Sequence, residues 1–197
     1  MNNSAYPTRR RTGIISSLAL TAALVLGATG CSGDDSTSSS ASAKPDTKKA
    51  ATSVDAGLKA HSAGDLTAAS ADYKQALKYE PTNKFAFYNL ALIDASNGNY
   101  GLAEANYRSA IKSDAKYEPA LFNLAILQTS SDPAEAISLY KRAVAVERKD
   151  AAAWLNLGLL LRDKGKVTAG NKAVLRAIAL NPKLKDPQVA ATGKTAR

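Results

Sequence analysis

The chain has 197 residues, of which 45% are hydrophobic, 22% charged and only 6% aromatic, and its formal net charge is +9. A single cysteine cannot form an internal disulfide, and one cysteine with one histidine cannot supply the protein ligands of an ordinary zinc site. His61 is the only histidine that a Ser-His-Asp triad could use. The composition therefore argues against an enzyme and predicts no catalytic residue, cofactor or metal ion.

Residues 1–30 have the layout of an export signal. Three arginines, Arg9 to Arg11, precede an apolar run over residues 14–28 that ends in small residues. This order of a basic start, an apolar segment and small residues is typical of signal peptides. The run is shorter than the roughly 20 apolar residues that a membrane-spanning helix needs. We therefore predict a signal peptide that is removed, rather than a permanent span.

Cys31 follows this segment directly. The sequence Ala28-Thr29-Gly30-Cys31 resembles the lipobox of bacterial lipoproteins. The resemblance implies that Cys31 is acylated, for example with palmitate, and becomes the first residue of the mature chain. The protein would then be lipid-anchored at the extracytoplasmic face of a bacterial cell membrane. The alternative is an ordinary signal peptide with an incidental cysteine.

The segment 31–49 is rich in serine, threonine, aspartate and lysine and contains no bulky apolar side chain. Such a composition cannot bury enough apolar surface to offset the entropy cost of ordering. We expect a disordered tether that joins the acylated cysteine to a folded domain.

Two patterns recur through the rest of the chain at offsets of 33 or 34 residues. The first pattern occurs as Phe87-x2-Leu90-Ala91, Leu121-x2-Leu124-Ala125 and Trp154-x2-Leu157-Gly158. The second occurs as Ala69-x3-Tyr73-x2-Ala76, Ala103-x3-Tyr107-x2-Ala110, Ala136-x3-Tyr140-x2-Ala143 and, more loosely, Gly170-x3-Val174-x2-Ala177. Spacings of three and four residues place each set on one side of a helix. The small residues permit close helix contacts, and the large ones, Trp154 among them, are expected to fill the adjacent gaps.

These patterns resemble the tetratricopeptide repeat family, whose helix-turn-helix unit has a 34-residue period. Gly64, Gly98 and Gly165 stand where such units turn, and Pro81 and Pro182 stand where the late proline of the motif belongs. The resemblance implies an all-α, right-handed α-solenoid of about four repeats, over 50–83, 84–117, 118–150 and 151–184. We expect residues 185–197 to form a flexible tail, which would leave Leu175 and Ile178 partly exposed.

In repeats two to four, the first helix is apolar almost all round, so its second face must be covered or line a groove. We take the residues of this face as candidates for a peptide-binding groove: Phe85, Tyr88, Asn89, Leu92, Phe122, Asn123, Ile126, Leu155, Asn156 and Leu159. Asn89, Asn123 and Asn156 each precede the motif leucine, and their amides could pair with a peptide backbone. This resembles the asparagine ladder of certain tetratricopeptide glycosyltransferases and motor light chains. Hydrogen bonds between neighbouring helices are the alternative role.

The fourth repeat is basic. Six of its residues, Arg162, Lys164, Lys166, Lys172, Arg176 and Lys183, form a candidate basic patch. The patch could contact anionic lipid or an envelope polymer, or it could be a merely solvated face. Nucleic acid is not expected, because no aromatic residues interleave with these charges.

The sequence thus predicts a non-catalytic, membrane-anchored scaffold or assembly factor that binds a protein or peptide segment in its groove. Two alternatives remain open: a structural protein that self-associates into homo-oligomers, and a carbohydrate or envelope-polymer binder that uses the basic fourth repeat.

Overall fold

The computed structural model describes residues 44–186. The predicted signal peptide, Cys31 and most of the tether lie outside the described residues, as do residues 187–197. The described segment contains α-helices and no strands, in the order α1 (Thr47–Ser62), α2 (Leu66–Tyr79), α3 (Lys84–Ser96), α4 (Tyr100–Ser113), α5 (Glu118–Gln128), α6 (Pro133–Val146), α7 (Ala151–Asp163) and α8 (Val167–Leu180). None of these helices combines the length and the apolar character that crossing a bilayer would require.

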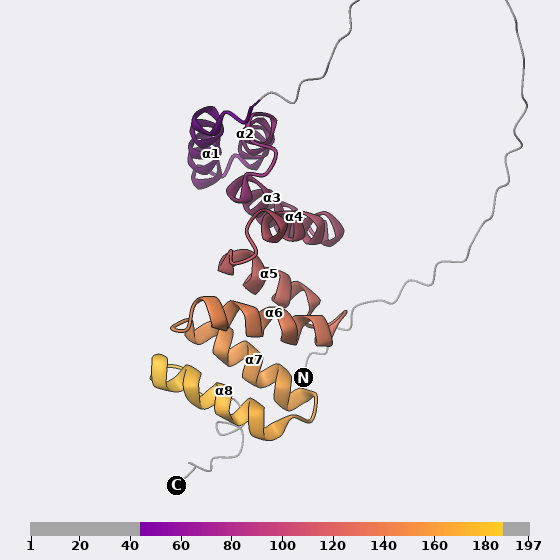
Figure 1. Cartoon of the computed structure of the whole chain (residues 1–197), viewed down its shortest axis with the longest axis vertical. Helices are drawn as coiled ribbons and strands as arrows, with labels where there is room; N and C mark the ends of the chain where they lie inside the picture. Colours follow the sequence, from indigo (N-terminus) through magenta and orange to yellow (C-terminus); the bar gives the residue numbers. More distant parts are fainter. Residues whose placement is uncertain (1–43, 187–197) are drawn as a thin grey trace, which may run out of the picture. The chain divides into compact units, whose positions relative to one another are not determined.

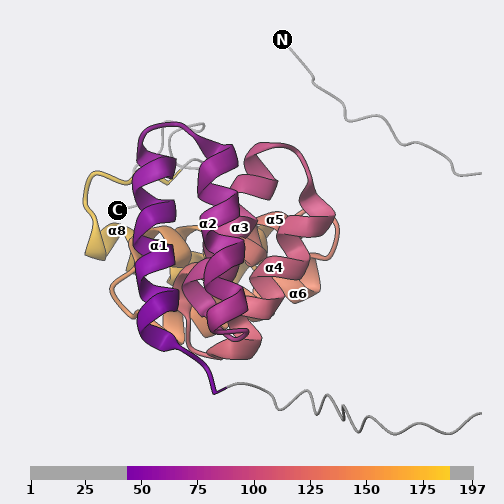
Figure 2. The same cartoon turned by 90° about the horizontal axis from the view of Figure 1, so that it is seen from above.

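The helices pair as four antiparallel hairpins, α1/α2, α3/α4, α5/α6 and α7/α8, which stack in chain order (Figure 1). The most extensive contacts are within each hairpin, followed by those between the second helix of one hairpin and the first of the next. A view along the stack shows α1 and α2 side by side, with the later helices behind them (Figure 2). The arrangement confirms the predicted all-α solenoid.

Local sequence signals account for the helix boundaries. Asp65 begins α2 by accepting a hydrogen bond of 2.8 Å from the backbone N–H of Ala68, as N-terminal capping residues do. Gly64, Gly98 and Gly165 end the turns of three hairpins with φ of 82°, 75° and 74°, a conformation that favours glycine. The hairpin α5/α6 has no glycine in its turn, and this is where the repeat is one residue shorter.

The start of the first repeat differs from the prediction. Helix α1 begins at Thr47, inside the segment expected to be a disordered tether up to residue 49. Asp46 explains the difference, because its carboxylate caps the helix by accepting from the Lys49 N–H at 3.0 Å. The backbone N–H of Asp46 also donates to the Tyr79 carbonyl at 2.9 Å, which fixes the start of α1 against the end of α2.

The expected tail also begins later than predicted. Asp186 lies in the range 185–197 that we expected to be flexible, yet its carboxylate forms two 2.7 Å hydrogen bonds with the Arg162 guanidinium. The side chains of Arg162 and Asp186 are only 8% and 11% exposed. The segment after α8 is therefore held against α7 up to residue 186.

Two apolar clusters form the core. The larger cluster runs from α3 to α8 and includes the fully buried Leu121 and Ala125. The smaller one joins α1, α2 and α3 around Tyr73. Helix α3 contributes to both, since Leu90 belongs to the smaller cluster and Ala91 to the larger.

Candidate functional site

Three predicted groove residues meet in one hollow between α5 and α7. Ile126 comes from α5, and Asn156 and Leu159 come from α7; Tyr140 of α6 completes one wall. The volume of about 710 Å³ is in the range of ligand-binding clefts. Ile126 is 47% exposed, so its apolar side chain is open to an occupant of this hollow. We call this hollow the α5–α7 groove.

Other predicted groove residues lie elsewhere or serve packing. Phe85 is exposed, but it faces α1 in a separate small hollow with Val54 and Leu58. The ring of Tyr88 packs edge-on against Tyr117 with centroids 5.5 Å apart. The remaining three, Leu92, Phe122 and Leu155, are half-buried, and Leu92 and Phe122 pack against the larger core cluster.

The three asparagines do not form a uniform ladder. Asn89 is buried and donates to the Phe85 carbonyl of its own helix at 2.8 Å. Asn123 donates to the Pro119 carbonyl at 2.9 Å and to the Tyr88 hydroxyl of the preceding repeat at 3.3 Å. Burial raises the pKa of Tyr140, an effect that the adjacent Asn156 partly opposes, and Asn156 also lines the α5–α7 groove. Asn89 and Asn123 thus bond to carbonyls of their own helices, Asn123 also bonds to the preceding repeat, and only Asn156 lines this groove.

The six basic residues do not form one patch. Arg162 is buried, where it pairs with Asp186 and also donates to the Asn171 side chain at 2.7 Å. Lys164 pairs with Asp163 at 2.9 Å beside the α5–α7 groove. Lys166 lies near the start of α8, and Lys183 is exposed beyond its end. Lys172 and Arg176 lie together on α8, where they line a second hollow.

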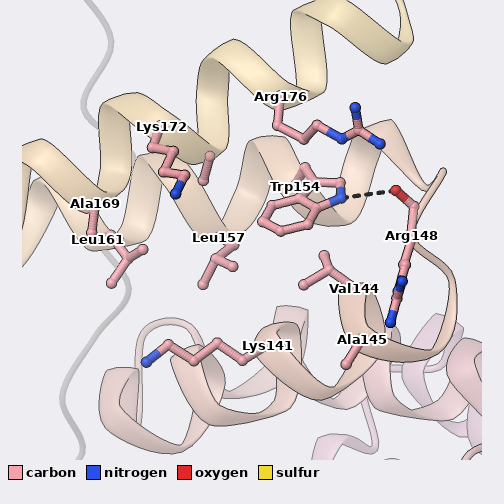
Figure 3. Close-up of a pocket in the computed structure, with 11 residues that line it drawn as sticks. Lys141, Val144, Ala145, Arg148, Trp154, Leu157, Leu161, Ala169, Lys172 and Arg176 are labelled. Carbon is pink, nitrogen blue, oxygen red and sulfur yellow. Dashed lines mark hydrogen bonds between the residues drawn. The ribbon is translucent and has the colours of Figure 1, made fainter.

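This second hollow lies between α6, α7 and α8 and was not foreseen from the sequence. It has a volume of about 610 Å³. Trp154, expected to fill the core, is only half-buried: it packs against the core and also lines the hollow, and its Nε1–H donates to the Arg148 carbonyl at 3.1 Å (Figure 3). Lys141 and Arg148 of the third repeat face Lys172 and Arg176 of the fourth across it. Lys141 lies on α6, whereas Arg148 lies in the turn that follows this helix, so helical spacing in the sequence does not relate the two.

Helix α8 is the last helix of the described segment, and its outer side is open as expected. Leu175 is 65% exposed, and Ile178 is half-buried.

A carboxyl cluster lies where the third and fourth hairpins meet. Burial, followed by the nearby negative charges of Asp150 and Glu147, raises the pKa of Glu118 to about 7. Glu118 Oε1 is buried and has no hydrogen-bond partner among the described residues. Across residues 44–186, no group of three or more histidine, cysteine, aspartate or glutamate residues is arranged to hold a metal ion.

Comparison with known proteins places these hairpins in a family. A family model described as a tetratricopeptide repeat matches residues 54–118 and 125–184. None of the curated proteins compared with the chain matches it.

Three solved structures resemble the chain. The crystal structure of MamA is 20% identical with a TM-score of 0.62, covering 70% of this chain and 81% of its own. A tetratricopeptide repeat protein from Parabacteroides merdae ATCC 43184 is 22% identical with a TM-score of 0.61, covering 70% of this chain and 55% of its own. The first TPR of Spaghetti (RPAP3), bound to the HSP90 peptide SRMEEVD, is 20% identical with a TM-score of 0.57, covering 61% of this chain and 98% of its own. These likenesses concern the fold.

Proposed function

We propose, from the premise that the chain belongs to the tetratricopeptide repeat family, that it is a membrane-anchored lipoprotein that binds a peptide segment of a partner in the α5–α7 groove. The tetratricopeptide fold indicates a protein–protein interaction scaffold, and one protein of similar fold is bound to a peptide. The protein would act without catalysis, as an adaptor or assembly factor.

The α5–α7 groove carries the proposal. It offers the exposed side chain of Ile126 for apolar contact and the Asn156 amide for a peptide backbone. The amide lies beside the Tyr140 hydroxyl, so its surroundings are partly fixed before any partner arrives. Ordering a side chain in advance lowers the entropy cost of binding.

The proposed lipid anchor is inferred from the sequence around Cys31. The stretch between Cys31 and the first helix, which begins at Thr47, could extend to roughly 50 Å. A tether of that reach would let the groove meet partners at some distance from the membrane surface.

Site-specific photo-crosslinking in intact cells tests the groove. A crosslinking amino acid at Ile126 should capture a partner protein, whereas the same amino acid at Leu102, which is 59% exposed on α4, should not. An Asn156→Ala change combined with the Ile126 probe should reduce the captured product, because the backbone contact is lost. Capture of the same proteins from both positions, or of none from Ile126, would exclude the α5–α7 groove as the binding site.

Mass spectrometry of the N-terminal peptide from isolated membranes tests the anchor. We expect a mature chain that begins with Cys31 carrying fatty acyl groups. An unmodified Cys31 would contradict the lipoprotein proposal and leave the groove proposal intact.

A further inference from the structure

We propose that the hollow between α6, α7 and α8 binds an amphipathic helix of a partner protein that carries acidic residues on both sides of its apolar stripe. We call this hollow the basic trough. It is separate from the α5–α7 groove, because the two are lined by opposite faces of α7: Trp154, Leu157 and Leu161 face the trough, and Asn156, Leu159 and Asp163 face the groove.

The floor of the trough is apolar along its length. Trp154, Leu157 and Leu161 follow one another at spacings of three and four residues, so they form a straight row along α7. Val144 and Ala173 extend this floor toward α6 and α8. The Trp154 Nε1–H, the one polar group of the ring, is already occupied by the Arg148 carbonyl. Leu157, Leu161, Val144 and Ala173 are at most 5% exposed, so among these floor residues the half-buried Trp154 is the one that presents carbon surface to an occupant.

Both walls of the trough carry positive charge. Lys141 projects from α6 and Arg148 from the turn that follows it, whereas Lys172 and Arg176 project from α8 (Figure 3). No acidic residue lines the trough, and none of these four side chains forms a salt bridge with a residue between 44 and 186. Four cations without counter-charges beside an apolar floor favour an occupant that is itself acidic.

The distribution of apolar and charged groups in the trough favours a helical occupant over an extended peptide or a lipid. An extended peptide would bring unpaired backbone N–H and C=O groups onto an apolar floor, which is costly, whereas a helix satisfies its own backbone. A fatty acid or lipid has its charge at one end, but the trough has cations on both walls. A helix with apolar residues at i, i+4 and i+7 and glutamates on each flank would match the floor and both walls together.

Trp154 provides a direct measurement, because the chain has only one tryptophan and it lies in the trough. The full chain is titrated with a synthetic helix-forming peptide of about 15 residues, with leucine at i, i+4 and i+7 and glutamate on both flanks. We expect the Trp154 emission to shift on binding at physiological salt. A peptide with lysine in place of every glutamate should bind at least about tenfold more weakly.

Charge reversal on both walls supplies the decisive comparison. The double variant Lys141→Glu/Lys172→Glu should weaken binding of the glutamate peptide by about tenfold or more and should improve binding of the lysine peptide. Lys78→Glu/Lys112→Glu makes the same change in net charge at exposed positions outside the trough, and should alter affinity less than about twofold because salt screens distant charges. The neutral double variant Lys141→Gln/Lys172→Gln should fall between wild type and charge reversal. Circular dichroism establishes that each variant is folded.

Three results would overturn the proposal. Equal affinity for the glutamate and lysine peptides, or equal weakening by both charge-reversal variants, would show that the trough does not recognise an acidic helix. Anionic phospholipid vesicles that shift Trp154 emission and displace the peptide would assign the trough to a membrane surface instead. A shift that grows with protein concentration in the absence of peptide would assign it to a second copy of the chain.

Discussion

Helices α7 and α8 pack closely where Gly158 of α7 faces Gly170 of α8. A Cβ at Gly158 would lie 2.9 Å from both the Gly170 carbonyl oxygen and the Val174 backbone nitrogen. Backbone atoms cannot rotate away as a flexible side chain can, so an added methyl group must force the helices apart. Gly101 in α4 has a helical backbone and no such neighbour within 4 Å.

Gly158 and Gly101 should respond to substitution by alanine in opposite ways. Gly158→Ala should lower the free energy of unfolding by about 1–3 kcal/mol, because it overpacks the α7/α8 contact. Gly101→Ala should raise it by about 0.5–1 kcal/mol, because alanine loses less conformational entropy in a helix. Urea unfolding followed by circular dichroism measures both. If Gly158→Ala is neutral, the two helices are not as tightly fixed as described.

Individual side-chain roles were only partly predictable at this scale. The period of the repeats correctly placed Tyr107 and Tyr140 in the core, where they are 3% and 2% exposed. The same period gave Asn89 and Asn156 equivalent positions, yet Asn89 donates to its own helix and Asn156 lies beside Tyr140 and lines the α5–α7 groove. An asparagine amide has several partners within reach, and local geometry rather than spacing decides which one it uses.

At the scale of single elements, the bond between α7 and the segment after α8 has a measurable effect. Asp186→Ala should destabilise the protein by about 2 kcal/mol, because the buried Arg162 guanidinium would lose its carboxylate partner. Asp163→Ala is a matched control: its side chain is 66% exposed and pairs with Lys164, so the loss should stay within about 0.5 kcal/mol. Equal thermal shifts for the two variants would contradict a structural role for the Arg162–Asp186 pair.

Glu118 makes the contact between α5 and the α6–α7 connection sensitive to pH. Its pKa is about 7 in the folded protein, above the ordinary value near 4.5 that applies when the chain is unfolded. Between these pH values the folded state keeps a proton that the unfolded state has lost, so stability falls as the pH rises from about 4.5 to 7 and then stays level. The cause is burial of the carboxyl group, reinforced by Asp150 and Glu147.

Removing the charge of Glu118 should remove this dependence of stability on pH. Glu118→Gln should stabilise the protein more at pH 8 than at pH 5, since the amide carries no charge and can donate to Asp150. Asp55→Asn, an exposed change on α1, should shift stability equally at both pH values. Chemical denaturation of the three proteins at each pH checks this; a Glu118→Gln effect that does not vary with pH would contradict the raised pKa.

Element boundaries were predictable where a local signal marked them. Gly64, Gly98 and Gly165 correctly indicated three turns because a positive φ favours glycine. The start of α1 was missed because the polar composition before residue 50 masked the capping role of Asp46. The basic trough was missed for a different reason: it combines residues of two repeats, and the sequence alone does not give the register between α6 and α8.

At the scale of the whole described segment, the division of the core predicts uneven stability. The first hairpin contacts a neighbour on one side only, and its cluster is the smaller of the two. In repeat arrays, stability depends on each unit and its immediate interfaces. Hydrogen exchange should therefore show backbone amides of α1 and α2 exchanging at least about tenfold faster than those of α5 and α6, which have neighbours on both sides. Uniform protection across the four hairpins would indicate that they unfold as one unit.

The stacking of hairpins in chain order also has a consequence for synthesis. Every helix finds its main contacts in the helix before or after it, so little of the fold depends on residues far apart in the sequence. Proteins dominated by such local contacts fold rapidly. As the chain emerges, from the ribosome or from the membrane after the export proposed above, α1 and α2 can close first, and each later hairpin can dock onto a finished neighbour. The nascent chain need never wait for its C-terminus before it begins to bury apolar surface.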